Sequence, residues 1–158
     1  MEFDPAAADL SLAALFTGWA LADELQRRLS TDGFADSRFA DGVVFQHLIA
    51  GPVTITTLAE RLGVTQQAAS KTVADLQRRG YVTRRTDPAD ARAKQVLLAD
   101  RGQAVITAAR NHRAALDAEL RNALGNNRVE AARQLLLDTL THLNATPALR
   151  TRTIRPPR

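Results

Sequence analysis

The chain has 158 residues, which fits one domain or one compact domain with appendages. Hydrophobic residues make up 45% and aromatic residues 4%, so a core can form, and its mostly Ala and Leu content favours helices. The absence of cysteine excludes disulfides, thiolate metal sites and thiol redox switches. No apolar run approaches the ~18 residues of a membrane span, and the acidic N-terminus is unlike a signal peptide. We therefore predict a cytoplasmic protein with no membrane partner.

The charge is unevenly distributed along the chain. Residues 1–60 carry three arginines against nine acidic residues, whereas residues 61–101 carry nine basic residues against four acidic ones. The tail at 144–158 adds four arginines and no acid. One basic segment within a chain of net charge +4 predicts a single polyanion-binding face.

Two helices are predicted in the first third of the chain. Apolar residues recur at helical spacing from about 8 to 29, and the pattern ends near Thr31-Asp32-Gly33. A second, shorter helix is predicted from about 39 to 50, where Gly51-Pro52 stops it.

A pair of short helices follows. The pattern predicts a two-turn helix with one apolar face at residues 54–62 and a tight turn at Gly63-Val64-Thr65. Thr65 is placed to cap a second helix that runs to about Arg79, and Gly80 is its expected left-handed stop. A short glycine turn between two helices is typical of a helix-turn-helix, in which the second helix projects outward.

The outer face of that second helix carries the first group of candidate DNA-binding residues. Glutamine can pair with adenine, serine can bond a base or a phosphate, and lysine can reach guanine or a phosphate. The helix N-terminus also directs free N–H groups at an anion, and small side chains allow close approach to a groove floor. The alternative is that this is the ordinary polar face of a soluble helix. The candidates are Thr65, Gln66, Gln67, Ala68, Ser70 and Lys71.

A charged β-ribbon is predicted after Gly80. Asp87 can close an Asx turn and Pro88 suits its second position, while Asp100 is the expected N-cap of the next helix. Taken alone, the ribbon could be a solvated hairpin with incidental charge. After a helix-turn-helix, it is typical of a DNA-gripping wing, so we predict a mainly α, winged helix-turn-helix fold with a two-stranded β wing. The wing candidates for DNA contact are Arg84, Arg85, Arg92 and Lys94.

Two long helices are predicted at the C-terminal end, from Asp100 to about 124 and from about 128 to 143, separated by Gly125-Asn126-Asn127. We assign residues 1–33 and 100–144 to a helical dimerisation region and residues 34–99 to the DNA-binding lobe. The alternative is that the terminal helices only cover the core of a monomer. The tail at 145–158 is rich in Pro and Arg and is expected to be flexible.

Three motifs stand out: LAERLGV at 58–64, LQRRGYV at 76–82 and D-P-x-D-x-R-x-x-x-V-x-L-x-x-x-G at 87–102. They give the chain a family resemblance that covers roughly residues 10–143. It resembles the MarR-type bacterial transcription regulators. The resemblance implies a symmetric dimer formed by the first and last two helices, with the helix matching 65–79 in the major groove. It also implies that Arg92 reaches the flanking minor groove and that Asp90, with Asp87 at the turn, braces the wing. Gln67 and Ala68 depart from the more usual Ser and Thr, so no operator preference is carried over.

The predicted function is a sequence-specific regulator of transcription that binds double-stranded DNA. It would act as a homodimer on a pseudo-palindromic operator, most simply as a ligand-responsive repressor. A sequence-tolerant DNA-binding protein and a winged helix used for protein–protein interaction are the alternatives. A small-molecule effector would bind near the junction of the terminal helices and the lobe, although each candidate lining residue could equally be plain core. Those candidates are Phe16, Trp19, Phe45 and His47.

Catalysis is not expected. The three histidines (His47, His112 and His142) lie far apart with no metal-ligand spacing, and the sequence has no Gly-rich phosphate loop or nucleophile motif. We therefore predict neither a metal nor a cofactor.

Overall fold

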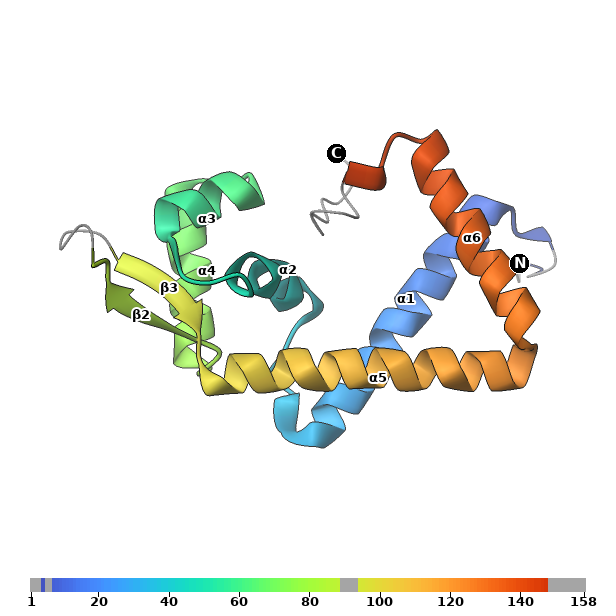
Figure 1. Cartoon of the computed structure of the whole chain (residues 1–158), viewed down its shortest axis with the longest axis horizontal. Helices are drawn as coiled ribbons and strands as arrows, with labels where there is room; N and C mark the ends of the chain where they lie inside the picture. Colours follow the sequence, from blue (N-terminus) through green and yellow to red (C-terminus); the bar gives the residue numbers. More distant parts are fainter. Residues whose placement is uncertain (1–3, 5–6, 89–93, 148–158) are drawn as a thin grey trace.

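A computed structural model describes residues 4, 7–88 and 94–147 of the chain (Figure 1). It confirms the predicted mainly α, winged helix-turn-helix fold. Among the described residues, no helix combines the length and apolar character needed to cross a bilayer. The elements in chain order are α1 (Leu10–Leu29), the π-helical turn η2 (Ser30–Phe34), α2 (Phe39–Leu48), β1 (Val53–Thr54), α3 (Ile55–Leu62), α4 (Gln66–Arg78), β2 (Val82–Thr86), β3 (Lys94–Leu98), α5 (Asp100–Leu124) and α6 (Asn126–His142).

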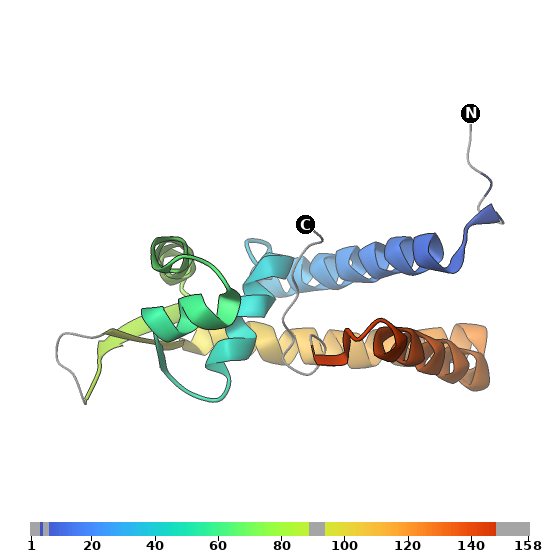
Figure 2. The same cartoon turned by 90° about the horizontal axis from the view of Figure 1, so that it is seen from above.

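The molecule has two parts, which we call the winged lobe (α2 to β3) and the stalk (α1, α5 and α6). The winged lobe lies at one end of the long helix α5 and α6 lies at the other, while α1 packs against α5 between them (Figures 1 and 2). The short helix α3 and the recognition helix candidate α4 pack on each other within the lobe. The candidate DNA-binding residues on α4 therefore sit far from α6.

A small antiparallel sheet forms the wing and its base, in the strand order β1-β3-β2. Strand β2 pairs with β3 along its full length, from Val82 opposite Leu98 to Thr86 opposite Lys94. The predicted ribbon is thus present, but β1 adds a third strand by pairing Val53 with Val96. The sequence did not reveal β1 because a two-residue strand that leads directly into a helix shows no alternation.

The hydrophobic core lies inside the winged lobe and reaches the stalk only at its near end. The inward stripe of α4, formed by Ala69, Val73 and Leu76, is completely buried. The start of α5 joins the same core through Val105 and Ile106. The largest completely buried side chains are Leu58, Val73, Leu76, Tyr81 and Val96.

The local signals around α4 are confirmed. The Thr65 hydroxyl accepts a hydrogen bond from the Ala68 N–H at 3.1 Å, and Gly63 adopts the left-handed conformation with φ 65°. Gly80 has φ 79°, a backbone conformation that L side chains rarely adopt. These three residues fix where α4 begins and ends.

The N-cap prediction for Asp100 is wrong by one residue. Ala99 precedes the helix in extended conformation, and its N–H donates to the Tyr81 carbonyl at 3.0 Å. This bond prolongs the pairing of the ribbon up to the helix start, so Asp100 becomes the first helical residue. An acid in the first turn still interacts favourably with the helix dipole. At the other end of α5, α6 begins at Asn126, two residues before the predicted start.

The stalk leaves large apolar side chains in solvent. No residue of α6 is buried, and Leu143, just after it, is 65% exposed. Phe16 and Trp19 on α1 contact each other with ring centroids 5.2 Å apart, yet are 58% and 55% exposed. The other exposed apolar residues of the stalk are Leu10, Leu15, Leu21, Leu124, Leu135 and Leu136.

Candidate nucleic-acid interface

The outer face of α4 carries the predicted polar residues away from the core. Thr65, Gln66, Gln67, Ala68 and Lys71 are exposed, and Ser70 is partly buried. Because the opposite face of the helix supplies Ala69, Val73 and Leu76 to the core, α4 can rotate little about its own axis. The fold therefore presents a fixed set of polar groups to solvent.

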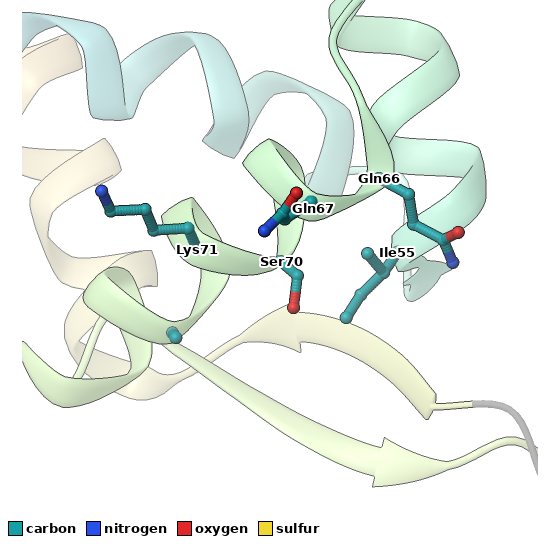
Figure 3. A pocket seen from close by; sticks show the side chains of 6 residues that line it. Ile55, Gln66, Gln67, Ser70 and Lys71 are labelled. Carbon is teal, nitrogen blue, oxygen red and sulfur yellow. The ribbon is translucent and has the colours of Figure 1, made fainter.

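A groove runs along this face (Figure 3). Its volume is about 580 Å³, and its lining brings together four of the predicted residues: Gln66, Gln67, Ser70 and Lys71. Lys71 extends away from Ile55 and Gln66, so the groove has an amide-rich part and a cationic part (Figure 3). The remaining lining residues are Ile55 and Ala74.

The two glutamines of the groove differ in their freedom. The Gln66 side-chain amide donates to the Thr56 hydroxyl at 3.0 Å, which fixes it against α3. Within the described part of the chain, no hydrogen bond holds the Gln67 amide. Gln67 is therefore the glutamine whose donors and acceptor are free to meet a ligand.

Ile55 is a groove residue that the sequence analysis missed. It opens α3 directly after the Thr54 cap and is partly buried, in contact with the core. The sequence shows it only as one of the apolar positions of α3. Its place beside Ser70 and Gln66 becomes visible once α4 is packed on α3 (Figure 3).

The two wing arginines on β2 point to opposite faces of the ribbon. The Arg84 guanidinium turns toward α4 and donates from Nη2 to the Ser70 carbonyl at 3.4 Å. Its Nε is buried and has no partner among the described residues. Arg85 is exposed and donates to the Gln95 side chain at 3.1 Å. The strand alternation thus separates two residues that the sequence analysis grouped as DNA contacts of the wing.

The other wing candidates are only partly described. Lys94 is exposed and its ammonium donates to the Thr86 hydroxyl at 2.9 Å, across the β2–β3 pair. Asp87 is partly buried at the end of the described part of the ribbon. The predictions for Asp90 and Arg92 fall outside the described residues.

The four candidate effector-lining residues are not brought together. Phe16 and Trp19 lie on the exposed part of α1, whereas Phe45 is 3% exposed in the lobe core, 5.7 Å from the Tyr81 ring. His47 is partly buried, and burial together with nearby Arg61 lowers its pKa. Phe45 is thus a core residue of α2.

A buried ion-pair cluster that the sequence did not predict fixes the far end of α4. The sequence shows Arg79 only as the approximate end of the helix. In the structure its guanidinium donates to both Asp41 oxygens at 2.6 and 3.0 Å and to Asp75 at 2.7 Å. The Arg79 and Asp41 side chains are 10% and 6% exposed, and the hydrogen bond with Asp41 raises the pKa of Arg79. This cluster ties the end of α4 to the start of α2.

Comparisons with known proteins agree with this arrangement. The sequence model of the MarR family matches residues 42–93, which include the helix pair and β2. A search of the curated proteins gives no match.

Similar solved structures share the fold. One is a mutant of MepR from Staphylococcus aureus bound to an oligodeoxyribonucleotide, with 19% identity, a TM-score of 0.64, and coverage of 86% of this chain and 99% of that one. Another is the transcriptional repressor CouR bound to a 23-mer DNA duplex, with 21% identity, a TM-score of 0.63, and coverage of 91% and 98%. A third, a MarR family transcription regulator, has 25% identity, a TM-score of 0.63, and coverage of 86% and 88%.

The fold and the helix–turn–helix–wing order define a winged-helix protein. The MarR family model matches the helix pair and β2, and the solved structures share the fold of the whole chain, which confirms the predicted resemblance to MarR-type regulators. The solved structures that share the fold include proteins described as a transcriptional repressor and a transcription regulator.

Proposed function

We propose that the protein is a DNA-binding transcriptional regulator that acts as a homodimer on a pseudo-palindromic operator. The observation that carries the proposal is the groove on the outer face of α4, where Gln67, Ser70 and Lys71 meet. These side chains offer amide, hydroxyl and ammonium groups at the spacing of one helix face. Such a set matches the donors and acceptors on base edges in a major groove.

Each groove residue has a role in this proposal. Gln67, whose amide is free, would pair with an adenine edge, and Lys71 would bind guanine or a phosphate. The apolar side chains of Ile55 and Ala74 fit the methyl group of a thymine. Thr65 and Ala68 would let the helix N-terminus approach a phosphate, because one caps the helix and the other is small.

The wing would supply contacts to the DNA backbone on either side. Arg85 and Lys94 are exposed on the ribbon. Arg92, which the family resemblance implies for the minor groove, is part of the same proposal. Arg84 would support α4 from beneath through the Ser70 carbonyl. Phosphate contacts of this kind position a protein on the duplex, whereas base contacts specify the sequence.

The exposed stalk supports the homodimer. One recognition helix discriminates weakly, because each good bidentate pair contributes only about 1–3 kcal/mol. A two-fold dimer would double the contacts and require half-sites about one helical turn apart. The apolar residues of α1 and α6 that face solvent in the single chain would then be covered by the partner.

We also propose that the protein is a repressor and that a small-molecule effector releases it from DNA. CouR, which shares the fold, is described as a transcriptional repressor and was captured on a duplex. A ligand that changed the distance between the two recognition helices would release the operator. Screening small molecules for release of a bound duplex tests this part.

Substitutions on α4 test the DNA-binding role directly. Lys71→Met should weaken binding to a duplex selected from a random pool and reduce the slope of log K against log salt by up to about one, because a phosphate contact is lost. Gln67→Ala should change the preferred bases at one position of the site. Fluorescence anisotropy across a salt series measures both effects.

A matched control removes one positive charge from the stalk. Arg27→Met does so on α1, where Arg27 pairs with Glu24 on the same helix, and it should leave binding and slope unchanged. Equal affinity of the wild type for selected and random duplexes would favour the sequence-tolerant alternative. No binding to either duplex in moderate salt would favour a protein-interaction module.

A further inference from the structure

A polar cluster joins the stalk to the winged lobe at the start of α5. The Arg101 guanidinium donates to the Asp36 carboxylate at 2.9 and 3.2 Å and to the Arg79 carbonyl at 2.6 Å. It also donates to the Gly33 carbonyl at 3.3 Å and lies 4.6 Å from the centre of the Tyr81 ring. One side chain of α5 thus holds the segment after α1 and the C-terminal end of α4 together.

Tyr81 closes the cluster from inside the lobe. It is completely buried, and its hydroxyl donates to Asp36 at 2.6 Å. Burial and the bond to Asp36 raise the pKa of Tyr81 to about 12. Burial alone would raise the pKa of Asp36, but the hydrogen bonds from Tyr81 and Arg101 outweigh it and lower that pKa. At neutral pH the cluster therefore keeps an ionised Asp36 between two donors.

The backbone next to Arg101 is packed without spare room. A Cβ on Gly102 would lie 2.1 Å from the Tyr81 carbonyl oxygen and 3.1 Å from a Leu98 methyl carbon. The same Tyr81 oxygen accepts the Ala99 N–H at 3.0 Å. The helix α5 therefore rests directly on the segment that links α4 to β2. A close backbone contact and a partly buried polar cluster at the same point resist rotation of the lobe against α5.

We propose that Arg101, Asp36 and Tyr81 form a rigid joint that sets the half-site spacing the dimer accepts. The inference rests on the proposed function, because spacing has meaning only for a dimer on two half-sites. These are positioning residues: Arg101 holds the end of α4 through the Arg79 carbonyl, and none of the three lines the groove.

DNA geometry makes the distance between two half-sites a sensitive measure of how rigid the joint is. Each added base pair moves a half-site by about 3.4 Å along the axis and rotates it by roughly 35°. A dimer with rigid joints at both lobes loses contacts at the second half-site when the spacer changes. A dimer with loosened joints follows the shift, so it tolerates several spacers while each recognition helix keeps its own base contacts.

The experiment compares Arg101→Met with the Arg27→Met control, which removes the same charge elsewhere on the stalk. Affinities are measured for duplexes with two identical selected half-sites and spacers varied in one-base-pair steps, and for a duplex with one half-site. We expect the wild type and Arg27→Met to lose about tenfold in affinity at one base pair from the optimum, and Arg101→Met to lose less than about threefold. The affinity of Arg101→Met for the duplex with one half-site should stay within about twofold of the wild-type affinity.

Tyr81→Phe keeps the buried ring, removes only the hydroxyl donor to Asp36, and should give an intermediate spacing profile. Thermal unfolding establishes which variants are folded, and if Arg101→Met does not fold, Tyr81→Phe decides the question. An unchanged spacing profile in the folded variants would overturn the joint. Equal weakening at every spacing and on the single half-site would overturn it too, because that is the signature of a merely destabilised lobe. A wild type without any preferred half-site would instead overturn the proposed function.

Discussion

The winged lobe and the stalk are both built from amphipathic helices, yet the stalk buries its apolar side chains only at its near end, against the lobe. In the lobe, α4 contributes three completely buried residues to a core that also holds Leu58, Tyr81 and Val96. In the stalk, no residue of α6 is buried, and Leu135 and Leu136 are 51% and 44% exposed. Contiguous exposed apolar surface of this kind marks an interaction face. The lobe and the near end of the stalk thus share one core, and we propose that a partner covers the rest of the stalk.

Polar side-chain pairs also join α1 and η2 to α5 within one chain. Helices α1 and α5 are joined by the Arg28–Glu119 pair at 2.6 Å, and η2 is joined to α5 by the Asp32–His112 pair at 2.7 Å. Exposed ion pairs contribute little net stability, with typical values of about 0–1 kcal/mol. In the proposed homodimer, the exposed apolar side chains of α1 and α6 would lie against the partner.

Truncation of one leucine in each region should separate the two kinds of core. Leu76→Ala removes a completely buried side chain and should cost roughly 2–5 kcal/mol of unfolding free energy at any protein concentration. Leu136→Ala should cost little for the isolated chain, but its cost should grow with protein concentration, because the proposed dimer would bury this side chain. Denaturant titrations at two concentrations, with sedimentation analysis, measure both. A small cost of Leu136→Ala that does not depend on protein concentration would contradict the proposal that a partner covers α6.

Alanine substitutions at two glycines compare the packed junction between lobe and stalk with the open surface of α1. Gly102→Ala forces a Cβ against the Tyr81 carbonyl and should destabilise the protein by about 1–3 kcal/mol. Gly18→Ala, in the middle of α1, meets nothing within 4 Å and should stabilise by roughly 0.5–1 kcal/mol, because alanine favours the helix. Thermal unfolding compares the pair. Equal effects of the two substitutions would mean that α5 is not packed tightly on the lobe.

The smallest effect is expected at alkaline pH. The folded-state pKa of Tyr81 is raised to about 12 from an ordinary value of 10.0, so the folded protein binds this proton more tightly than the unfolded chain. The stabilisation is fully present below pH 10 and is lost as the pH rises from about 10 to about 12. In a melting series between pH 8 and 12, Tyr81→Phe should lose less stability than the wild type. Parallel curves of stability against pH for the two proteins would contradict this role of the Tyr81 hydroxyl.

The sequence predicted those parts of the fold that local signals define. The Thr65 cap, the Gly63 turn and the Gly80 stop each act within a few residues, so the position of α4 and four residues of its groove followed from the pattern. The third strand was missed because its two residues carry no periodicity. The direction of Arg84 toward α4 also depends on how β2 is seated, which no local motif reports.

The two ion-pair clusters were invisible for a different reason. Arg79 reaches Asp41 across 38 positions of sequence, and Arg101 reaches Asp36 across 65. Charged residues at such separations look like solvated surface until the helices are placed. Phe45 likewise occupies a helix that is apolar on most of its surface, so its spacing did not tell core from ligand pocket.

The most direct test of the central claim is selection of bound sequences from a random duplex pool by the full chain. The account predicts an enriched inverted repeat with half-site centres about one helical turn apart, bound by two chains per duplex. An enriched pool with no repeated motif, or a complex with one chain per duplex, would contradict it.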